Sequence, residues 1–515
     1  MKKELSKYLL IPLILVSFYV NYYYGSKGVL AVDTFSHFDS AYKILKGVII
    51  FRDFWNISGG VIDYLQLPFF YFFGTNWSSY ILQSSIFNSC LTVTTYYFFK
   101  NIGLDNIKSF FYSICFAILA NPSMGTPFVD HYSTFFSLLS FYSFILAIKS
   151  NSKLYWFLLP ILLFLAFFSK QTPAAYVILS IFLAIIIYIF INKKFSFIKP
   201  LLSGIFICLI FLTIFLILNE IKISEFITQY FLFPQTIGSS RISNFKLDLN
   251  NTILNFKFIH IFLILLLYAL YKKRNVEIEE NKFKFILNFT LFIFSFSLIF
   301  HQIYTKNFIF IFFLIPLIGG VLHNQFNFFK YKKIFINFLI LITLFSTFKY
   351  HQRFNIDRKM LNLENIDLDK AIDASKINKK LAGLKWITYG PLTPSEEIKL
   401  IKDSLKIIDN DKNEILLLTH YNFFSSVLEK TLYSPSRWPT DLVSNPSKNN
   451  KYYNYYISFT KNLILKRKIK SIYITIPSYQ DIVLDVFDSE CVKKARLNKI
   501  LIHYKINDDC TRFSQ

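Results

Sequence analysis

The chain has 515 residues, of which 54% are hydrophobic and 62 are phenylalanine. A water-soluble protein of this length does not carry so many long apolar runs, so the composition predicts an integral membrane protein. The formal net charge is +24, but much of the lysine lies in short connections beside apolar runs. That placement indicates membrane orientation rather than nucleic-acid binding, so we expect no nucleic-acid partner. The abundance of Ile, Asn, Lys and Phe is typical of an AT-rich bacterial source.

Apolar runs of about 17–25 residues, with a few shorter ones, predict about eleven membrane spans. Their approximate limits are 8–24, 77–99, 108–121, 131–149, 154–169, 173–191, 200–219, 252–271, 284–301, 306–322 and 333–349. Every second connection is the lysine-rich one, so the positive-inside rule places the N-terminus in the cytoplasm and the C-terminal tail outside. The predicted location is therefore the bacterial cytoplasmic membrane, with an external, periplasmic tail.

The expected fold is a polytopic α-helical membrane domain over residues 1–350, followed by an external α/β domain over residues 351–515. In the tail, Thr393-Pro394-Ser395-Glu396 predicts a capped helix that extends to about Ile408. Strands are expected at 414–419, 471–476 and 500–506, with a helical stretch at 422–430 and the segment 480–490 between the last two strands. Alternating elements of this kind indicate a small α/β domain. Cys491 and Cys510 are expected to form a disulfide there, because the compartment is predicted to be oxidising.

The external loop 25–76 is too long to be a simple connection, and long loops in compact proteins are usually functional. Its first part, from about Thr34 to Lys46, has aromatic residues at helical spacing and ends at Gly47. Asp33 would stand at the N-cap of this helix. A second amphipathic run ends at Gly74, and two surface helices with aromatic faces suit a site that handles lipid.

Charged residues beside the hydrocarbon boundary are costly and are therefore candidates for function. The predicted external face carries Asp33, Asp130, Lys170, Arg241 and Lys306. Cations can hold a leaving phosphate and a carboxylate can deprotonate an acceptor hydroxyl, so this set suits a polyprenyl-phosphate donor. The alternatives are structural: Asp33 as a helix cap, Lys170 extending from the end of an apolar span, and Arg241 as an ordinary solvated residue.

Four segments carry a family resemblance. They are 32–47, an acid-led external helix ending in Gly; 51–55 with 64–68, a second surface helix; Val129-Asp130-His131, a second external acid; and Phe168-Ser169-Lys170-Gln171-Thr172, a lysine motif. In this order they resemble the GT-C superfamily of integral membrane glycosyltransferases, near the protein mannosyltransferase and aminoarabinose transferase group. The resemblance covers about the first 190 residues, and the helix pattern extends it to about residue 350.

The resemblance implies Asp33 as the catalytic carboxylate, Asp130 as a second carboxylate that supports catalysis, and Lys170 as a contact of the donor phosphate. Arg241 and Lys306 are expected to bind the same phosphate because they lie on the same predicted external face. Many relatives have two adjacent acids where this chain has Asp33-Thr34, so the second acid comes from elsewhere or is missing. Asp39 and Asp53 are candidates to replace it. His37 and His131 could be proton partners or could make structural hydrogen bonds. No spacing of metal ligands indicates an ion, so no metal site or other cofactor is predicted, and a divalent metal is left open as an alternative that the sequence does not support.

The expected activity is transfer of a sugar from a polyprenyl-phosphate carrier to a lipid, glycan or protein acceptor on the outer membrane face, in the biosynthesis of cell-envelope glycans. A second hypothesis, from a different functional class, is a transporter or flippase of lipid-linked saccharides. It would bind the substrate with the same cations but would need no general base. An internal repeat would favour transport, and the sequence has no recognisable one. A third hypothesis is a non-catalytic GT-C-like member that acts in an assembly.

The predicted topology can be tested by proteolysis of intact spheroplasts. Protease added outside should remove residues 351–515 and leave a protected membrane fragment, because every lysine-rich connection is predicted to face the cytoplasm. A cytoplasmic marker protein serves as the control for intact spheroplasts. A tail that survives while an external marker is digested would contradict the topology.

Overall fold

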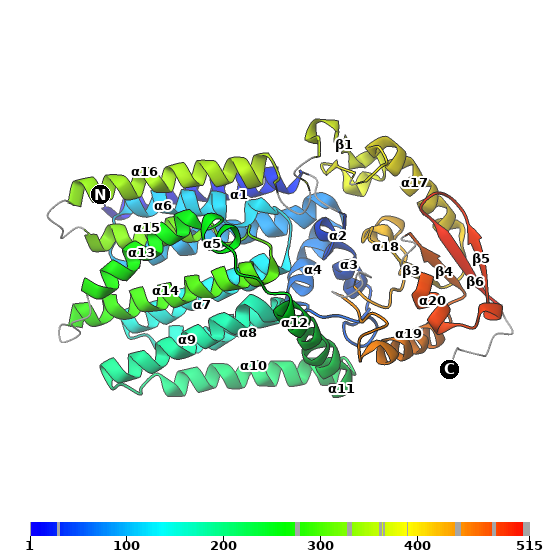
Figure 1. Cartoon of the computed structure of the whole chain (residues 1–515), viewed down its shortest axis with the longest axis horizontal. Coiled ribbons are helices and arrows are strands. Elements are labelled where there is room, and N and C mark those ends of the chain that lie inside the picture. The colour runs from blue at the N-terminus through cyan, green and yellow to red at the C-terminus, as the bar shows by residue number, and fades with distance from the viewer. Residues whose placement is uncertain are drawn as a thin grey trace. The chain divides into compact units, whose positions relative to one another are not determined.

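The computed structural model describes residues 2–27, 31–272, 279–326, 332–359, 363, 366–388, 390–437, 444–475 and 480–507 (Figure 1). Contacts divide the chain into two compact units. The first comprises Met1–Gly25, Ile81–Ile214 and Asn244–Glu364, and the second comprises Ser26–Tyr80, Phe215–Ser243 and Asn365–Gln515. The second unit thus combines the tail with parts of two predicted external loops, while the domain limits 1–350 and 351–515 stay predictions.

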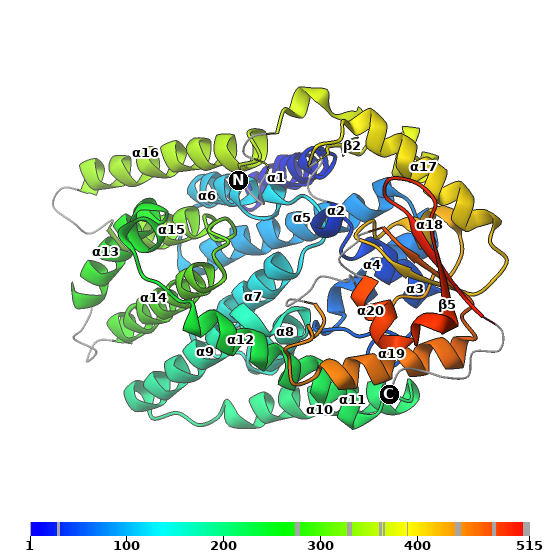
Figure 2. The ribbon, with the colours of Figure 1, turned by 45° about the vertical axis from the view of Figure 1, so that its right-hand side comes forward.

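The first unit is helical. Its helices are α1 (Lys2–Gly25), α6 (Asn106–Leu119), α7 (Val129–Ser150), α8 (Lys153–Ser169), α9 (Gln171–Asn192), α13 (Lys257–Lys272), α14 (Glu279–Thr305), α15 (Leu314–Gln325) and α16 (Lys332–Tyr350), together with most of α5 (Trp77–Ile102) and α10 (Ile198–Leu218). Helix α7 contacts α8, α9 and α14, and these four run side by side in Figures 1 and 2. On the other side of the unit, α15 contacts α6, α13 and α16.

Six of the described helices are long and apolar enough to cross a membrane: α1, α7, α9, α10, α14 and α16. Each of the eleven predicted spans overlaps a helix, but the other five coincide with helices that are shorter or more polar. The polytopic helical architecture is thus present, and the count of eleven stays a prediction. Burial separates the roles of these helices, since 89% of the apolar window of α7 is buried and only 11% of that of α10. We therefore expect α10 to face lipid.

The second unit contains a four-stranded sheet in the order β3 (Ile415–Leu418), β4 (Ser471–Ile474), β6 (Ile502–Ile506), β5 (Val492–Arg496). Strands β3 and β4 are parallel, whereas β6 pairs antiparallel with both β4 and β5. The three predicted strands are confirmed, although residue 476 lies outside the described residues. Strand β5 was not predicted, because its Lys493, Lys494 and Arg496 suit an exposed edge rather than a core.

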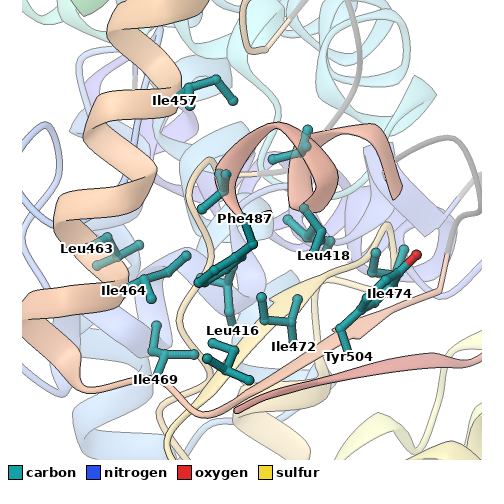
Figure 3. Close-up of a cluster of buried hydrophobic side chains, with 14 of the residues drawn as sticks. Leu416, Leu418, Ile457, Leu463, Ile464, Ile469, Ile472, Ile474, Phe487 and Tyr504 are labelled. Carbon is teal, nitrogen blue, oxygen red and sulfur yellow. The ribbon is translucent and has the colours of Figure 1, made fainter. Parts of the chain in front are cut away.

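Helices α19 (Tyr453–Arg467) and α20 (Gln480–Val486) share one hydrophobic core with strands β3, β4 and β6 of this sheet. Figure 3 shows Ile457, Leu463 and Ile464 of α19 together with side chains of β3, β4 and β6. The capped helix is confirmed as α17 (Pro394–Asn410), with a capping box between Thr393 and Glu396. The stretch predicted at 422–430 forms α18 (Phe424–Leu428). A two-stranded pair, β1 (Ile372–Asp373) and β2 (Lys385–Trp386), completes the described strands.

The first external loop folds into the second unit. Trp55 is fully buried in the core of the sheet domain, 5.5 Å from the ring of Tyr456 on α19. Its backbone N–H donates to Pro435, and the N–H of Arg437 donates to its carbonyl. The segment Phe51–Trp55 is therefore a turn that ends in a bridge between Trp55 and Ser436 of the tail, and the second helix of the loop, α4 (Val61–Phe73), begins only at Val61.

The prediction of one continuous helix from Thr34 to Lys46 is wrong at its start, because the helix begins only at Phe38. The structure has a four-residue helix α2 (Ala31–Thr34) and then α3 (Phe38–Leu45), whose N-cap is His37. Asp33 lies inside α2 and does not cap the longer helix. The predicted end is confirmed, because Gly47 has a φ of +85° and its N–H donates to the carbonyl of Ile44.

Candidate functional site

The first unit holds one compact cluster of predicted site residues. Asp130 lies in the first turn of α7, and Lys170 is the residue between the end of α8 and the start of α9. The Lys170 ammonium donates to both carboxylate oxygens of Asp130, at 2.6 and 2.8 Å. The hydroxyl of Ser133, one turn along α7, donates to the Lys170 carbonyl at 3.0 Å. The start of α7 therefore positions Asp130, and the junction between α8 and α9 positions Lys170.

Burial assigns different tasks to the two residues. The Asp130 side chain is 3% exposed, whereas that of Lys170 is 24% exposed. The His301 imidazole, near the end of α14, lies 3.6 Å from Asp130 Oδ1, one of the two oxygens that accept from Lys170. A buried carboxylate that accepts two charge-assisted hydrogen bonds is a poor proton acceptor for an outside group. Asp130 instead holds the ammonium of Lys170 in place, and the Lys170 side chain remains partly exposed.

His131, the neighbour of Asp130, takes part in a different contact. Its Nε2 lies 3.1 Å from the Ser123 hydroxyl, and its ring stacks on Phe135 with centroids 5.5 Å apart. The imidazole is fully buried. This is the structural hydrogen-bonding alternative considered for His131. Lys306, the fourth residue predicted in this unit, is exposed just after α14 and has a φ of +57°.

The second unit contains His37 in a buried ionic network. The Nδ1 of His37 lies 2.9 Å from Asp63 on α4, and the guanidinium of Arg437 forms an ion pair with the second carboxylate oxygen of Asp63. Ser40 on α3 also donates to Asp63. Burial alone would raise the pKa of Asp63, but Arg437 and His37 lower it below its ordinary value. For His37, in contrast, burial lowers the pKa, because it disfavours the charged imidazolium. The His37 imidazole is therefore neutral at neutral pH in the folded chain.

Asp39 does not face an open site. Its carboxylate accepts the backbone N–H groups of Ser425 and Ser426, at 3.3 and 2.9 Å, and Lys43 lies 3.8 Å away. These two N–H groups are in the first turn of α18, where a helix has unsatisfied donors. Asp39 therefore ties α3 to α18 and is a weak candidate for the second catalytic acid.

Asp53 is also fully paired. Arg52 donates to one carboxylate oxygen at 2.9 Å, as does the backbone N–H of Ile49, and Arg467 of α19 lies 3.1 Å from the other oxygen. Burial raises the pKa of Asp53, but these donors outweigh it and leave the pKa below its ordinary value. Asp53 therefore stays ionised and occupied, so it too is a weak replacement for the missing acid.

The remaining predicted residues also lie in the second unit. Asp33 is half-buried within α2, and Arg241 is half-buried in the last turn of α12 (Phe233–Ser243). Asp63 and Arg437, which form the ionic network, were missed by the sequence analysis. A carboxylate in the first turn of the apolar run 61–73 was an available signal for Asp63. Arg437 lies in an irregular segment and gave no signal.

In the part of the chain that the structure describes, no group of three or more His, Cys, Asp and Glu side chains is placed to hold a metal ion. The predicted disulfide stays a prediction, because Cys510 lies outside the described residues.

Comparisons with known proteins give a structural likeness but no match by sequence. No family model matches the chain, and no curated protein matches it. Among solved structures, the chain is similar to the crystal structure of the Archaeoglobus fulgidus oligosaccharyltransferase in complex with zinc and sulfate. The identity is 13%, with 92% of this chain and 69% of that chain covered, and the TM-score is 0.41. At that TM-score the likeness assigns neither the fold nor the activity of this chain.

Arg437 is expected to be important for the stability of the second unit. Arg437→Met leaves the Asp63 carboxylate buried beside only His37 and Ser40, and breaking a buried pair costs about 3–5 kcal/mol of unfolding free energy. Denaturant unfolding of the full chain in detergent measures the loss. The double variant Arg437→Met/Asp63→Asn should recover part of it, and Arg496→Met on the exposed strand β5 is the matched control. Equal stability of Arg437→Met and Arg496→Met would contradict the assignment.

Two histidines of the second unit, the buried His37 and the half-buried His420, predict a loss of stability in mild acid. Burial lowers the pKa of His37 and lowers that of His420 to about 4, whereas an unfolded histidine binds its proton near pH ~6.5. The unfolded chain then binds more protons than the folded chain, so stability falls as the pH drops from about 6.5 towards 4. The thermal midpoint measured across this range should fall less steeply for His37→Gln/His420→Gln than for wild type. Asn410→Gln, at an exposed position, should keep the wild-type slope, and an unchanged slope in the histidine variant would contradict the prediction.

Proposed function

We propose that the chain is a membrane-embedded glycosyltransferase of the GT-C type. It transfers a sugar from a polyprenyl-phosphate-linked donor to an acceptor on the outer face of the cytoplasmic membrane. The observation that carries the proposal is the Asp130–Lys170 pair, a buried carboxylate that fixes a partly exposed lysine where two apolar helices meet. Charged groups in such surroundings are expensive, and a fixed ammonium suits a phosphate that gains charge as it leaves.

In the proposed reaction, the acceptor oxygen forms a bond to the anomeric carbon of the donor sugar while the bond from that carbon to the phosphate oxygen breaks. The electron pair leaves with the polyprenyl phosphate, and Lys170 stabilises the charge, with Arg241 and Lys306 as further candidates. Asp33 accepts the proton of the acceptor hydroxyl. Asp130 is proposed as a positioning residue for Lys170, because both of its oxygens bind that lysine.

The exposed end of α4 supports a lipid substrate. Tyr71, Phe72 and Phe73 are 73%, 74% and 59% exposed, so three successive aromatic side chains extend from the same helix. Aromatic side chains on a short amphipathic helix are typical of contact with a membrane interface. The proposed partners are therefore a polyprenyl-linked sugar and the surrounding lipid. A flippase would need the same surface, and transfer in a purified system separates the two functions.

The test is transfer by the purified full chain in lipid nanodiscs, with an extract of polyprenyl-linked sugars as donor. Asp33→Asn should fold normally and lose about 100- to 10,000-fold in rate, because a positioned base contributes that much. Asp369→Asn, an exposed acid of the tail, is the matched control. Transfer by Asp33→Asn at the wild-type rate would remove Asp33 from the mechanism, and no transfer by wild type would favour the flippase.

Lys170 requires a paired design, because Lys170→Met leaves Asp130 buried without its cation. The double variant Lys170→Met/Asp130→Asn removes both charges and should fold, yet its apparent KM for the donor should rise at least about tenfold, as expected for a lost charged phosphate contact. Lys194→Met, at an exposed position, is the control. A folded double variant with wild-type KM and rate would contradict the role of the pair.

A further inference from the structure

The second unit contains a cavity that no step of the proposed reaction uses. Its volume is about 540 Å³, and we call it the α11–α19 cavity after the two helices that line it. Helix α11 (Ile223–Ile227) follows α10 in the chain and α19 belongs to the tail, and Figure 2 shows them next to each other. Arg52 and Asp53 contribute from the first loop. Cavities of roughly 300–1,000 Å³ are the size that small ligands occupy.

The charges of the cavity are balanced. Three cations and three carboxylates line it: Arg52, Lys222, Lys466, Asp53, Glu220 and Glu225. Each cation already lies within 4 Å of a carboxylate, as Arg52 with Asp53, Lys222 with Glu225, and Lys466 with Asp53, at 2.9, 3.6 and 3.6 Å. A phosphate or another anion would have to compete with these carboxylates, so the lining disfavours an anionic ligand.

The uncharged part of the lining suits hydroxyl groups and a ring. Ser224, Ser458 and Asn462 provide donors and acceptors, and paired charges can still accept or donate to a neutral hydroxyl. The Tyr455 residue is 37% exposed and its ring is held edge-on to Trp55, with centroids 6.1 Å apart. A fixed aromatic ring beside polar groups offers an apolar face to a sugar ring while the hydroxyls bind around it.

We propose that the α11–α19 cavity binds a neutral saccharide through Tyr455, Asn462 and the paired charges. This inference rests on the proposed function in one respect, because it assigns the bound saccharide as the acceptor glycan of the proposed transfer. Binding itself requires no transfer, so the two proposals can be tested separately.

The experiment measures binding of the full chain in lipid nanodiscs to an array of neutral and acidic oligosaccharides. Wild type should bind members of the neutral set. Ser458→Trp should abolish that binding, because Ser458 is exposed on α19 and the indole fills the cavity without removing a core contact. Ser395→Trp, at an exposed serine of α17 outside the lining, should bind as wild type does. Asn462→Ala should weaken binding about tenfold, with Asn410→Ala as its control.

Every outcome decides the proposal. Binding to the neutral set that Ser458→Trp abolishes and Ser395→Trp keeps supports it. Binding only to acidic oligosaccharides, no binding to the array, or equal binding by Ser458→Trp and Ser395→Trp overturns it. Neutral saccharide binding without transfer in the purified system would leave this inference standing and the proposed glycosyltransferase function refuted. Transfer without such binding would give the reverse result.

Discussion

The pairing of buried charge is the constraint on which this structure depends. A carboxylate removed from water needs a cation or several N–H groups, because its desolvation is otherwise too costly. In the second unit, Asp63 meets that need with Arg437 and His37, and so links the first loop to the tail. In the first unit, Asp130 meets it with Lys170. The cation of the Asp63–Arg437 pair is buried, whereas Lys170 in the Asp130–Lys170 pair is partly exposed. Lys170 is therefore the better candidate for a functional role.

The same constraint revises the tasks of the acids. Asp39 and Asp53, which the sequence offers as replacements for a second catalytic carboxylate, are both satisfied by neighbours in the second unit. Their charges stabilise the packing of the first loop against the tail rather than remaining available for proton transfer. Asp33 stays the candidate base on the strength of its place in the acid-led motif. The α11–α19 cavity is also lined by paired charges. Its three cations and three carboxylates balance, which disfavours binding of an anion, but these groups can still form hydrogen bonds with a neutral ligand.

Much of the architecture could be predicted from the sequence, because a long apolar run forms a membrane helix and a short apolar run between polar segments forms a buried strand. The runs that became α7, α9 and α10, the capping box at Thr393 and the strand Ile415–Leu418 were all predictable. The break between α2 and α3 was not, because the aromatic spacing of the segment continues through it. Arg437 was unpredictable for another reason: its partner Asp63 is more than 370 residues away in the sequence. Contacts of that kind depend on tertiary packing rather than on local pattern.

The most direct test of the account is the profile of lipid-linked and finished envelope glycans in cells with and without this protein. Deletion should cause one polyprenyl-linked sugar to accumulate and one glycan to lose the corresponding sugar residue. Wild-type protein should reverse both changes, and Asp33→Asn protein made in equal amount should reverse neither. Unchanged profiles after deletion, or full restoration by Asp33→Asn, would contradict the claim that this chain transfers a sugar with Asp33 as its base.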